Sequence, residues 1–305
     1  MKLQHLLVVI DPTREEQPAL ARARWIAERS GASLELLACD YTPALDNALL
    51  VAQRDLERAR LVQQAERLDW LERMAGPLRH DGITVTCHTL WGKPLYRQII
   101  SHVEQSQPDL VLKSTSRHGL LKRLFLTNTD WLLIRHCLQP LWLVHQGEWA
   151  GQRLCAALDP LHESDKPAAL DHRLIGIARE FEQRLQLQAH YLHSYIAVPQ
   201  TLAFNAELLA DYDDYVKRTE QHHRQAFDSL LDQHPAIDRR MTFLEQGFAE
   251  DAIPEFVRRH SIDLLLMGAV ARGQLDNALI GQTAERVLEE VECDLLVVKP
   301  VAQGV

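Results

Sequence analysis

The chain contains the same set of sequence signals twice. An apolar run that ends in Asp-Pro occurs at Leu6–Pro12 and again at Leu154–Pro160. Near the end of each half a second apolar run follows an aspartate, at Asp109 and at Asp263, and these repeats lie 148 and 154 residues apart. That distance is far longer than the ~20–50 residues of a solenoid unit. The sequence therefore predicts a duplicated domain whose two copies can be compared.

The length also fits two domains. A chain of 305 residues corresponds to about two domains, and each half is long enough to bury its own core. The join at Gln146–Gln152 is short and polar and contains two glycines. We therefore expect domains over residues 1–148 and 152–305 that pack together instead of swinging freely.

Short apolar runs alternate with helical patterns through both halves. Pro18–Ser30 has helical spacing and is ended by Gly31, and Val51–Leu78 is a candidate for a long helix. The apolar stripe of this long helix consists of Leu61, Ala65, Leu68, Leu71 and Leu78. Alternation of this kind predicts an α/β fold, with two tandem, doubly wound, Rossmann-like parallel sheets of about five strands each.

Composition excludes several classes of protein. The formal net charge of −9 argues against a nucleic-acid-binding face, which needs clustered Lys and Arg. The sequence has no run of the ~20 apolar residues that a membrane span requires, and Met1–Leu3 leads directly into a strand pattern with no signal-peptide anatomy. Five scattered cysteines without a Cys-x-x-Cys motif are typical of a reducing compartment. We expect a cytoplasmic protein.

Ligands of open parallel sheets bind beyond the carboxyl ends of the strands. In the second half two features fall there: Asp159 after the first strand, and the loop Gly268–Gly273 after the fourth, with Gly281 opening a helix further on. Glycines let backbone N–H groups approach a phosphate, and a helix N-terminus adds a favourable dipole. Arg272 supplies a cation, and Thr283 can cap the helix or bind an oxygen.

The segment Leu264–Pro300 resembles the universal stress protein family, and the first half resembles the tandem members of that family. The residues that carry the second resemblance are Val8–Pro12, Gln17–Leu20, Asp109–Lys113 and Thr129–Trp131. The resemblance covers nearly the whole chain. It implies a non-catalytic stress-response protein whose two halves pack as a pseudo-dimer, and it places the aspartate of the first strand near an adenosine.

The family's nucleotide pattern is Gly, two residues, Gly, nine residues, Gly, then Ser or Thr. It begins here at Gly268 and reaches Gly281 with the spacing intact, but Ala271 and Gln282 depart from it. An alanine forced into a left-handed conformation costs about 1–2 kcal/mol. We therefore expect only weak binding of ATP or AMP. The candidate nucleotide-binding residues are Asp159, Gly268, Arg272, Gly273, Gly281 and Thr283.

The first half has lost more of the pattern. Its equivalent loop, Lys113–Gly119, lacks the first and third motif glycines and carries several basic residues. These residues form either an anion site made of side chains or a solvated basic turn. Asp11 either lies near a ligand or is an Asx-turn residue at the strand-to-helix corner. A nucleotide is not expected in this half.

The segment Tyr191–Tyr215 holds four of the six tyrosines together with several apolar residues. It follows the second strand of the second half and should lie over the same edge as the glycine loop. One interpretation is a lid over a pocket for a small apolar or acyl ligand. The other is a helical hairpin that buries its apolar stripe against the other domain.

No catalytic motif is present, so we expect no enzymatic activity. No metal site is expected either, because His190 and His193 point to opposite faces of a strand and His222 and His223 diverge on a helix. Three hypotheses remain: a nucleotide-sensing module, a carrier or sensor of an apolar ligand, and a protein-interaction scaffold with vestigial pockets. The sequence identifies no protein partner and leaves the pairing of two chains open.

Overall fold

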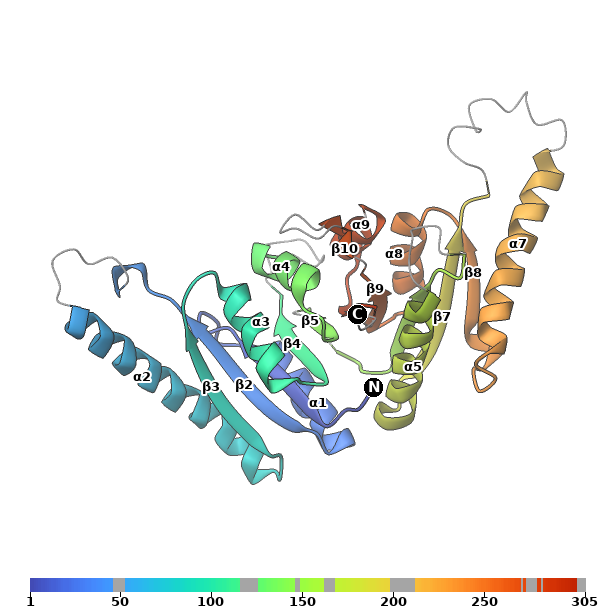
Figure 1. The fold of residues 1–305 in the computed structure, drawn as a ribbon. Coiled ribbons are helices and arrows are strands. Elements are labelled where there is room, and N and C mark those ends of the chain that lie inside the picture. Colours follow the sequence, from blue (N-terminus) through green and yellow to red (C-terminus); the bar gives the residue numbers. More distant parts are fainter. Residues whose placement is uncertain are drawn as a thin grey trace. The chain divides into compact units, whose positions relative to one another are not determined.

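The computed structural model describes residues 1–45, 53–115, 126–145, 149–161, 168–197, 212–269, 271–272, 279–280 and 282–300. The chain divides into two compact units, one containing β1 to β5 and the other β6 to β12. Figure 1 shows the elements of each unit along the chain. No helix within the described residues is both long and apolar enough to cross a bilayer.

The first unit alternates strands with helices. Its elements are β1 (His5–Ile10), α1 (Pro18–Ser30), β2 (Ser33–Asp40), α2 (Gln53–His80), β3 (Val85–Trp91), α3 (Leu95–Ser106), β4 (Leu110–Ser114), α4 (Asn128–His136) and β5 (Leu141–Val144). The strands lie in the order β3-β2-β1-β4-β5, and all of these neighbours are parallel. The strand order reverses beside β1, so the carboxyl ends of β1 and β4 meet at the place where such sheets bind ligands.

The second unit repeats this plan. Its elements are β6 (Arg153–Leu158), α5 (Ala168–Leu185), β7 (Gln188–Tyr195), α7 (Tyr212–Asp232), β8 (Thr242–Gln246), α8 (Ala249–Arg259), β9 (Leu264–Gly268), α9 (Gln282–Glu290) and β12 (Asp294–Val298). The order β8-β7-β6-β9-β12 matches that of the first unit, and its pairs are also parallel. The expected fold, two tandem doubly wound α/β domains, is confirmed. The pseudo-dimer packing and the domain limits of 1–148 and 152–305 stay predictions.

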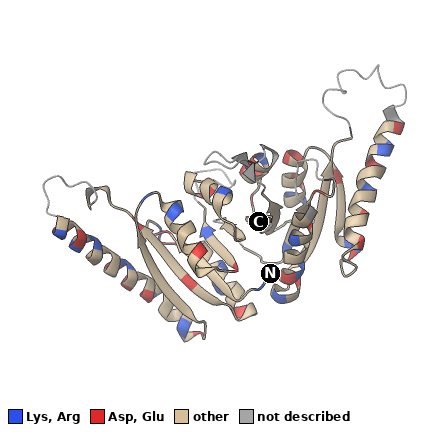
Figure 2. Ribbon diagram, viewed as in Figure 1, with Lys and Arg blue, Asp and Glu red and all other residues tan. Residues whose placement is uncertain are grey.

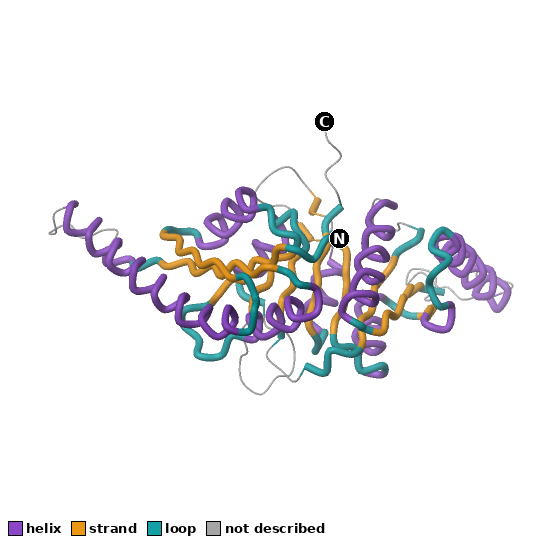
Figure 3. Tube along the Cα trace, turned by 90° about the horizontal axis from the view of Figure 1, so that it is seen from below, coloured by secondary structure: helices purple, strands orange, loops and turns teal. Residues whose placement is uncertain are grey.

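Right-handed crossovers place helices on both faces of each sheet. In the first unit α3 packs against α4, and in the second unit α8 packs against α9, while α1 and α5 cover their sheets from the other side. The tube view shows helices on both sides of the strands of each unit (Figure 3). The strands between the layers are apolar because both of their faces are buried; all but the first residue of β1 and every residue of β12 are buried.

The repeated aspartates have the same structural role in both units. Asp109 Oδ2 accepts hydrogen bonds from the backbone N–H groups of Gln4 and His5, at 2.9 and 3.0 Å. Asp263 Oδ2 accepts from the matching N–H groups of Gln152 and Arg153, at 2.9 and 2.8 Å. Each aspartate therefore ties the loop before the fourth strand to the start of the first, at the amino edge of its sheet.

Only part of the apolar stripe predicted for α2 packs on the sheet. Leu71 and Leu78 are buried, but Leu61 is 66% exposed and Leu68 37% exposed, and Ala65 is also exposed. The inward side instead carries Arg67, whose guanidinium pairs with a carboxylate at the end of β2. Charged residues of both signs follow one another along this helix (Figure 2). The predicted stripe is therefore correct at Leu71 and Leu78 and wrong at Leu61, Ala65 and Leu68, because a polar side chain with a partner lies on the inner side there.

Candidate functional site

The carboxyl edge of the second sheet brings two of the candidate residues together. β6 ends at Leu158 and β9 at Gly268, and the two strands are neighbours in register, with Ala156 opposite Leu266. Asp159, directly after β6, therefore lies at the same edge as Gly268. The side chain of Asp159 is half-buried and bonds to no residue that the structure describes.

The remaining candidate residues belong to the loop between β9 and α9. Arg272 lies in β10 (Ala271–Arg272), which pairs antiparallel with β11 (Leu279–Ile280), a short hairpin that the sequence did not predict. Thr283 lies in the first turn of α9. Gly273 and Gly281 lie outside the described residues. The assignment of these residues to a nucleotide therefore stays a prediction.

The peptide unit between Leu158 and Asp159 is held from both sides. His193 Nδ1 lies 3.1 Å from the carbonyl oxygen of Leu158, and the backbone N–H of Asp159 donates to Asp171 Oδ1 at 3.2 Å. The other ring nitrogen of His193 lies 2.9 Å from Nδ1 of His223 on α7. Sequence reasoning correctly separated His190 from His193 but missed this second pair, since it depends on how α7 is rotated against β7.

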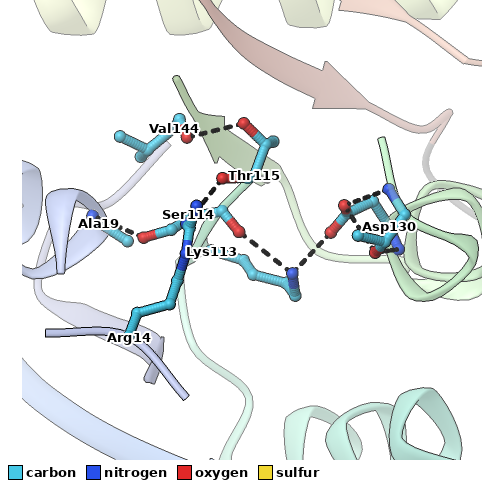
Figure 4. Close-up of polar contacts among 8 residues, drawn as sticks. Arg14, Ala19, Lys113, Ser114, Thr115, Asp130 and Val144 are labelled. Carbon is cyan, nitrogen blue, oxygen red and sulfur yellow. Dashed lines mark hydrogen bonds and ion pairs between the residues drawn. The ribbon is translucent and has the colours of Figure 1, made fainter. Parts of the chain in front are cut away.

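In the first unit an ion pair stands beside the equivalent edge. Lys113 on β4 reaches Asp130 in the first turn of α4, with 2.7 Å between Nζ and Oδ1, and the Asp130 side chain is fully buried (Figure 4). The other oxygen of Asp130 accepts from the backbone N–H of Thr127 at 2.7 Å, and the Thr127 hydroxyl accepts from the backbone N–H of Asp130 at 3.2 Å. This reciprocal capping box places a carboxylate at the helix start.

Side chains also fill the turn after β4. Ser114 Oγ accepts from the backbone N–H of Ala19 at 3.1 Å, Thr115 Oγ1 donates to the carbonyl oxygen of Val144 at 3.1 Å, and Arg14 Nη1 donates to the carbonyl oxygen of Thr115 at 2.7 Å (Figure 4). Lys113 is thus part of an ion pair and not of a solvated turn. The other basic residues of that loop lie outside the described residues.

Asp11 is the counterpart of Asp159 in the first unit and has a local role. Its Oδ1 accepts from the backbone N–H of Thr13 at 3.0 Å and from the Thr13 hydroxyl at 2.6 Å. The Asx-turn interpretation is confirmed for this residue. The two first-strand aspartates therefore differ, because the Asp11 carboxylate stabilises its own turn and that of Asp159 does not.

A second polar cluster lies at the opposite, amino edge of the first sheet. The carboxylate of Glu35 on β2 lies 2.6 Å from His102 Nε2, 2.9 Å from His5 Nε2 and 3.4 Å from His88 Nε2. Burial would raise the pKa of Glu35, but the hydrogen bond from His102 and the charges of the three rings outweigh it and hold that pKa below its ordinary value.

The second unit has an aromatic cluster at the corresponding place. Glu35 pairs with Leu7 in the register of β1 and β2, and His190 pairs with Cys155 in that of β6 and β7. The His190 ring lies 5.7 Å from Phe243 and 6.3 Å from Phe256, measured between ring centroids. Burial lowers the pKa of His190. The two copies therefore differ at both edges of their sheets.

Two further expectations have limited support within the described residues. No three histidine, cysteine or carboxylate side chains there are grouped so that they could hold a metal ion, and the expected lack of a metal site stays a prediction.

The proposed lid, Tyr191–Tyr215, falls largely on residues 198–211, which lie outside the described residues. Its described part begins in β7, where Tyr191 and Tyr195 are buried. The apolar-ligand hypothesis stays a prediction.

Comparison with known proteins identifies the family. The model of the universal stress protein family matches residues 2–145 and 153–299. The chain is 29% identical to universal stress protein E of Escherichia coli (strain K12), over 97% of this chain and 94% of that protein. It is 28% identical to a homolog of that protein in Haemophilus influenzae, over 98% of each.

Solved structures agree with this assignment. A putative universal stress protein from Pseudomonas aeruginosa UCBPP-PA14 superposes with a TM-score of 0.72 and 26% identity, over 98% of this chain and 94% of that one. One from Archaeoglobus fulgidus has a TM-score of 0.69 at 15% identity and shows the same fold. The chain thus belongs to the universal stress protein family, whose members act in stress responses, and carries two copies of the family domain.

Proposed function

We propose that the chain is a cytoplasmic, non-catalytic stress-response factor whose second unit binds an adenine nucleotide weakly. The phosphates would meet main-chain N–H groups at the start of α9, and Asp159 would face the nucleoside. The first unit would serve as a structural half. Arg272, Gly273, Gly281 and Thr283 complete the proposed site.

A single contrast between the units supports this proposal. β4 and β9, and likewise α4 and α9, begin 154 residues apart, so Asp130 of α4 corresponds to Ala284 of α9. In the first unit the Asp130 carboxylate occupies the helix start, where it would repel a phosphate. Ala284 supplies no carboxylate at the matching place. Glu285 is the acidic residue of the first turn of α9, one position beyond the place of the Asp130 cap. A capping position without an acid leaves the N–H groups and dipole of the helix start to an external anion.

The same site argues for low affinity. Ala271 and Gln282 replace a glycine and a hydroxyl residue of the family pattern. A methyl group in place of a glycine hydrogen would limit close approach of a phosphate, and a lost hydrogen bond to a charged group costs about 1.5–3 kcal/mol. We expect a dissociation constant between about 0.1 and 1 mM, corresponding to roughly 4–5.5 kcal/mol of binding free energy.

Isothermal titration of the full chain with Mg-ATP tests the proposal. The decisive variant is Ala284→Asp, which places an acid at the capping position that Asp130 holds in α4 and should weaken binding at least about tenfold through charge repulsion. Ala284→Asn is the matched control, of similar size but uncharged, and should bind like the wild type. If no heat is released at millimolar nucleotide, the proposal that the chain binds nucleotide is wrong. If Ala284→Asp binds as well as Ala284→Asn, the start of α9 is not part of the site.

Protein binding is a second candidate function, favoured by one observation. Three large apolar side chains, Leu61, Val62 and Leu68, are exposed on α2. A deletion strain under stress separates the two candidates. If Ala284→Asp complements the deletion and Leu61→Asp does not, the scaffold function is supported over nucleotide sensing.

A further inference from the structure

The two units join the second strand to the following helix by different chemistry. In the first unit the Asp40 carboxylate at the end of β2 pairs with the Arg67 guanidinium of α2, at 2.7 Å to Nε and 3.2 Å to Nη2. In the second unit the joint between β7 and α7 is the contact of His193 with His223. These two residues are only 2% and 4% exposed. An Arg–Asp pair keeps its charges at neutral and mildly acid pH, whereas histidines titrate there.

Hydrogen bonding determines how many protons the histidine pair can hold. The carbonyl oxygen of Leu158 only accepts, so Nδ1 of His193 carries a hydrogen. Nε2 of the neutral His193 ring then accepts from Nδ1–H of His223. The short contact between the rings therefore holds one proton. If both rings are protonated, each facing nitrogen carries a hydrogen, and the contact becomes repulsive.

Within the described residues, the surroundings of the pair come from four elements. Two rings lie near that of His223, measured between centroids. The ring of His222, also on α7, is 6.1 Å away, and the ring of Tyr195 on β7 is 5.0 Å away. Burial raises the pKa of Tyr195; the charge of Glu220 raises it further and that of Arg224 lowers it. Glu220 and Arg224 form an ion pair with each other at 2.7 Å. On the side of β6 and α5, the described acidic groups joined to the Leu158–Asp159 peptide are Asp159 and Asp171, which accepts from the backbone N–H of Asp159.

The pair is connected to the candidate ligand edge through one peptide unit. Its carbonyl, from Leu158, accepts from His193, and its N–H, from Asp159, donates to Asp171. The first unit has Ala38 at the position of His193, because Ala38 is opposite Ile10 and His193 is opposite Leu158. This histidine support of the site edge therefore occurs in the second unit and not in the first.

We propose that His193 and His223 form a proton-sensitive joint that positions Asp159 at the ligand edge of the second unit. Acidification protonates both rings, separates α7 from β7 and loosens the Leu158–Asp159 peptide. The Asp40–Arg67 joint of the first unit keeps its contact over the same range. His193 is thus a positioning residue for Asp159. The consequence for ligand affinity rests on the proposed nucleotide binding, but the joint itself does not.

Hydrogen–deuterium exchange of the full chain tests the joint without a ligand. Between about pH 7.5 and about pH 5.5, after correction for intrinsic exchange, the opening equilibrium of α7 amides should rise about tenfold, and that of α2 amides beside Arg67 less than about threefold. His223→Gln should remove most of the rise in α7, because an amide can donate to or accept from His193 in either protonation state. Parallel changes in α2 and α7, or an unchanged rise in His223→Gln, would overturn the proposal. If the variant does not fold, the wild-type comparison of the two helices decides.

Titration with Mg-ATP at the same two pH values provides the second readout. Wild-type affinity should fall several-fold at the lower pH, while His223→Gln, which shares every effect of pH on the nucleotide itself, should fall less. An equal fall in both proteins contradicts the link from the joint to the site. Absence of binding at either pH overturns the proposed function, and the exchange result then decides the joint alone.

Discussion

Lys113 Nζ lies 2.7 Å from Asp130 Oδ1, and both side chains are withdrawn from solvent, at 14% and 0% exposure. The same carboxylate closes the capping box of α4 with Thr127. One buried acid therefore neutralises a strand lysine and satisfies the first turn of a helix. This arrangement stands where the second unit has Met267 on the strand and Ala284 in the helix.

Replacing Lys113 alone should lower the free energy of unfolding more than replacing both members of the pair. Lys113→Met leaves Asp130 buried without a cation, and the free energy of unfolding should fall by about 3 kcal/mol. The double variant Lys113→Met/Asp130→Asn should recover part of that loss, since no uncompensated charge remains and asparagine still bonds the helix start. Urea unfolding of both variants measures the difference. A loss below about 1 kcal/mol for the single variant would show that the pair is not isolated from water.

Much of the fold was predictable because turns and buried runs leave strong local signals. Pro18 and Gly31 mark the ends of α1, and Gly31 adopts φ 74°, which explains why the helix stops there. The buried run of β5 was placed correctly at Leu141–Val144 for the same reason, as its residues have no exposed face. The sequence also indicated which aspartates and glycines end the strands.

The chemistry at the strand ends was less predictable, because it depends on contacts between distant residues. Lys113 and Asp130 come from a strand and a helix, and their meeting depends on the path of the chain between them. The contact between His193 and His223 requires the rotation of α7 about its axis. Neither the path of the chain nor the rotation of a helix is encoded in local spacing. Lys113 was therefore predicted to lie in a basic loop, and the histidine pair was not predicted.

The two faces of α2 give a second prediction. Leu71 is fully buried and Leu61 is 66% exposed, although both lie on the stripe that hydropathy selects. Leu71→Ala should lower the free energy of unfolding by about 2–5 kcal/mol, and Leu61→Ala by less than about 0.5 kcal/mol. Thermal or urea unfolding of the two variants checks this. Equal losses would mean that Leu61 is buried in solution, for instance by a partner.

The Glu35 cluster gives a prediction with a definite dependence on pH. Because the pKa of Glu35 lies below its ordinary value, its ionised form stabilises the folded chain above the unfolded-state value of 4.5, and this contribution is lost as the pH falls through the lowered value. At about pH 7, Glu35→Gln should cost about 2 kcal/mol, since it weakens a charge-assisted bond to His102.

The measurement is urea unfolding of the wild type and Glu35→Gln from about pH 7 to about pH 3. The difference between the two should shrink below about pH 4.5. His80→Gln serves as a control because the His80 side chain is 90% exposed, and it should match the wild type throughout. A difference that grows below about pH 4.5 would contradict the assignment.

The two first-strand aspartates should respond oppositely to the same change. Asp11→Ala removes the acceptor of two bonds from Thr13 and should lower the free energy of unfolding by about 1 kcal/mol, without effect on nucleotide binding. Asp159→Ala removes a carboxylate that bonds to no described residue. It should leave stability within about 0.5 kcal/mol and weaken Mg-ATP binding about tenfold, a loss of about 1.4 kcal/mol. Calorimetric titration and thermal unfolding of both variants give the four values. Loss of stability without loss of affinity in Asp159→Ala would assign that residue to the turn, as in its twin, and remove it from the proposed site.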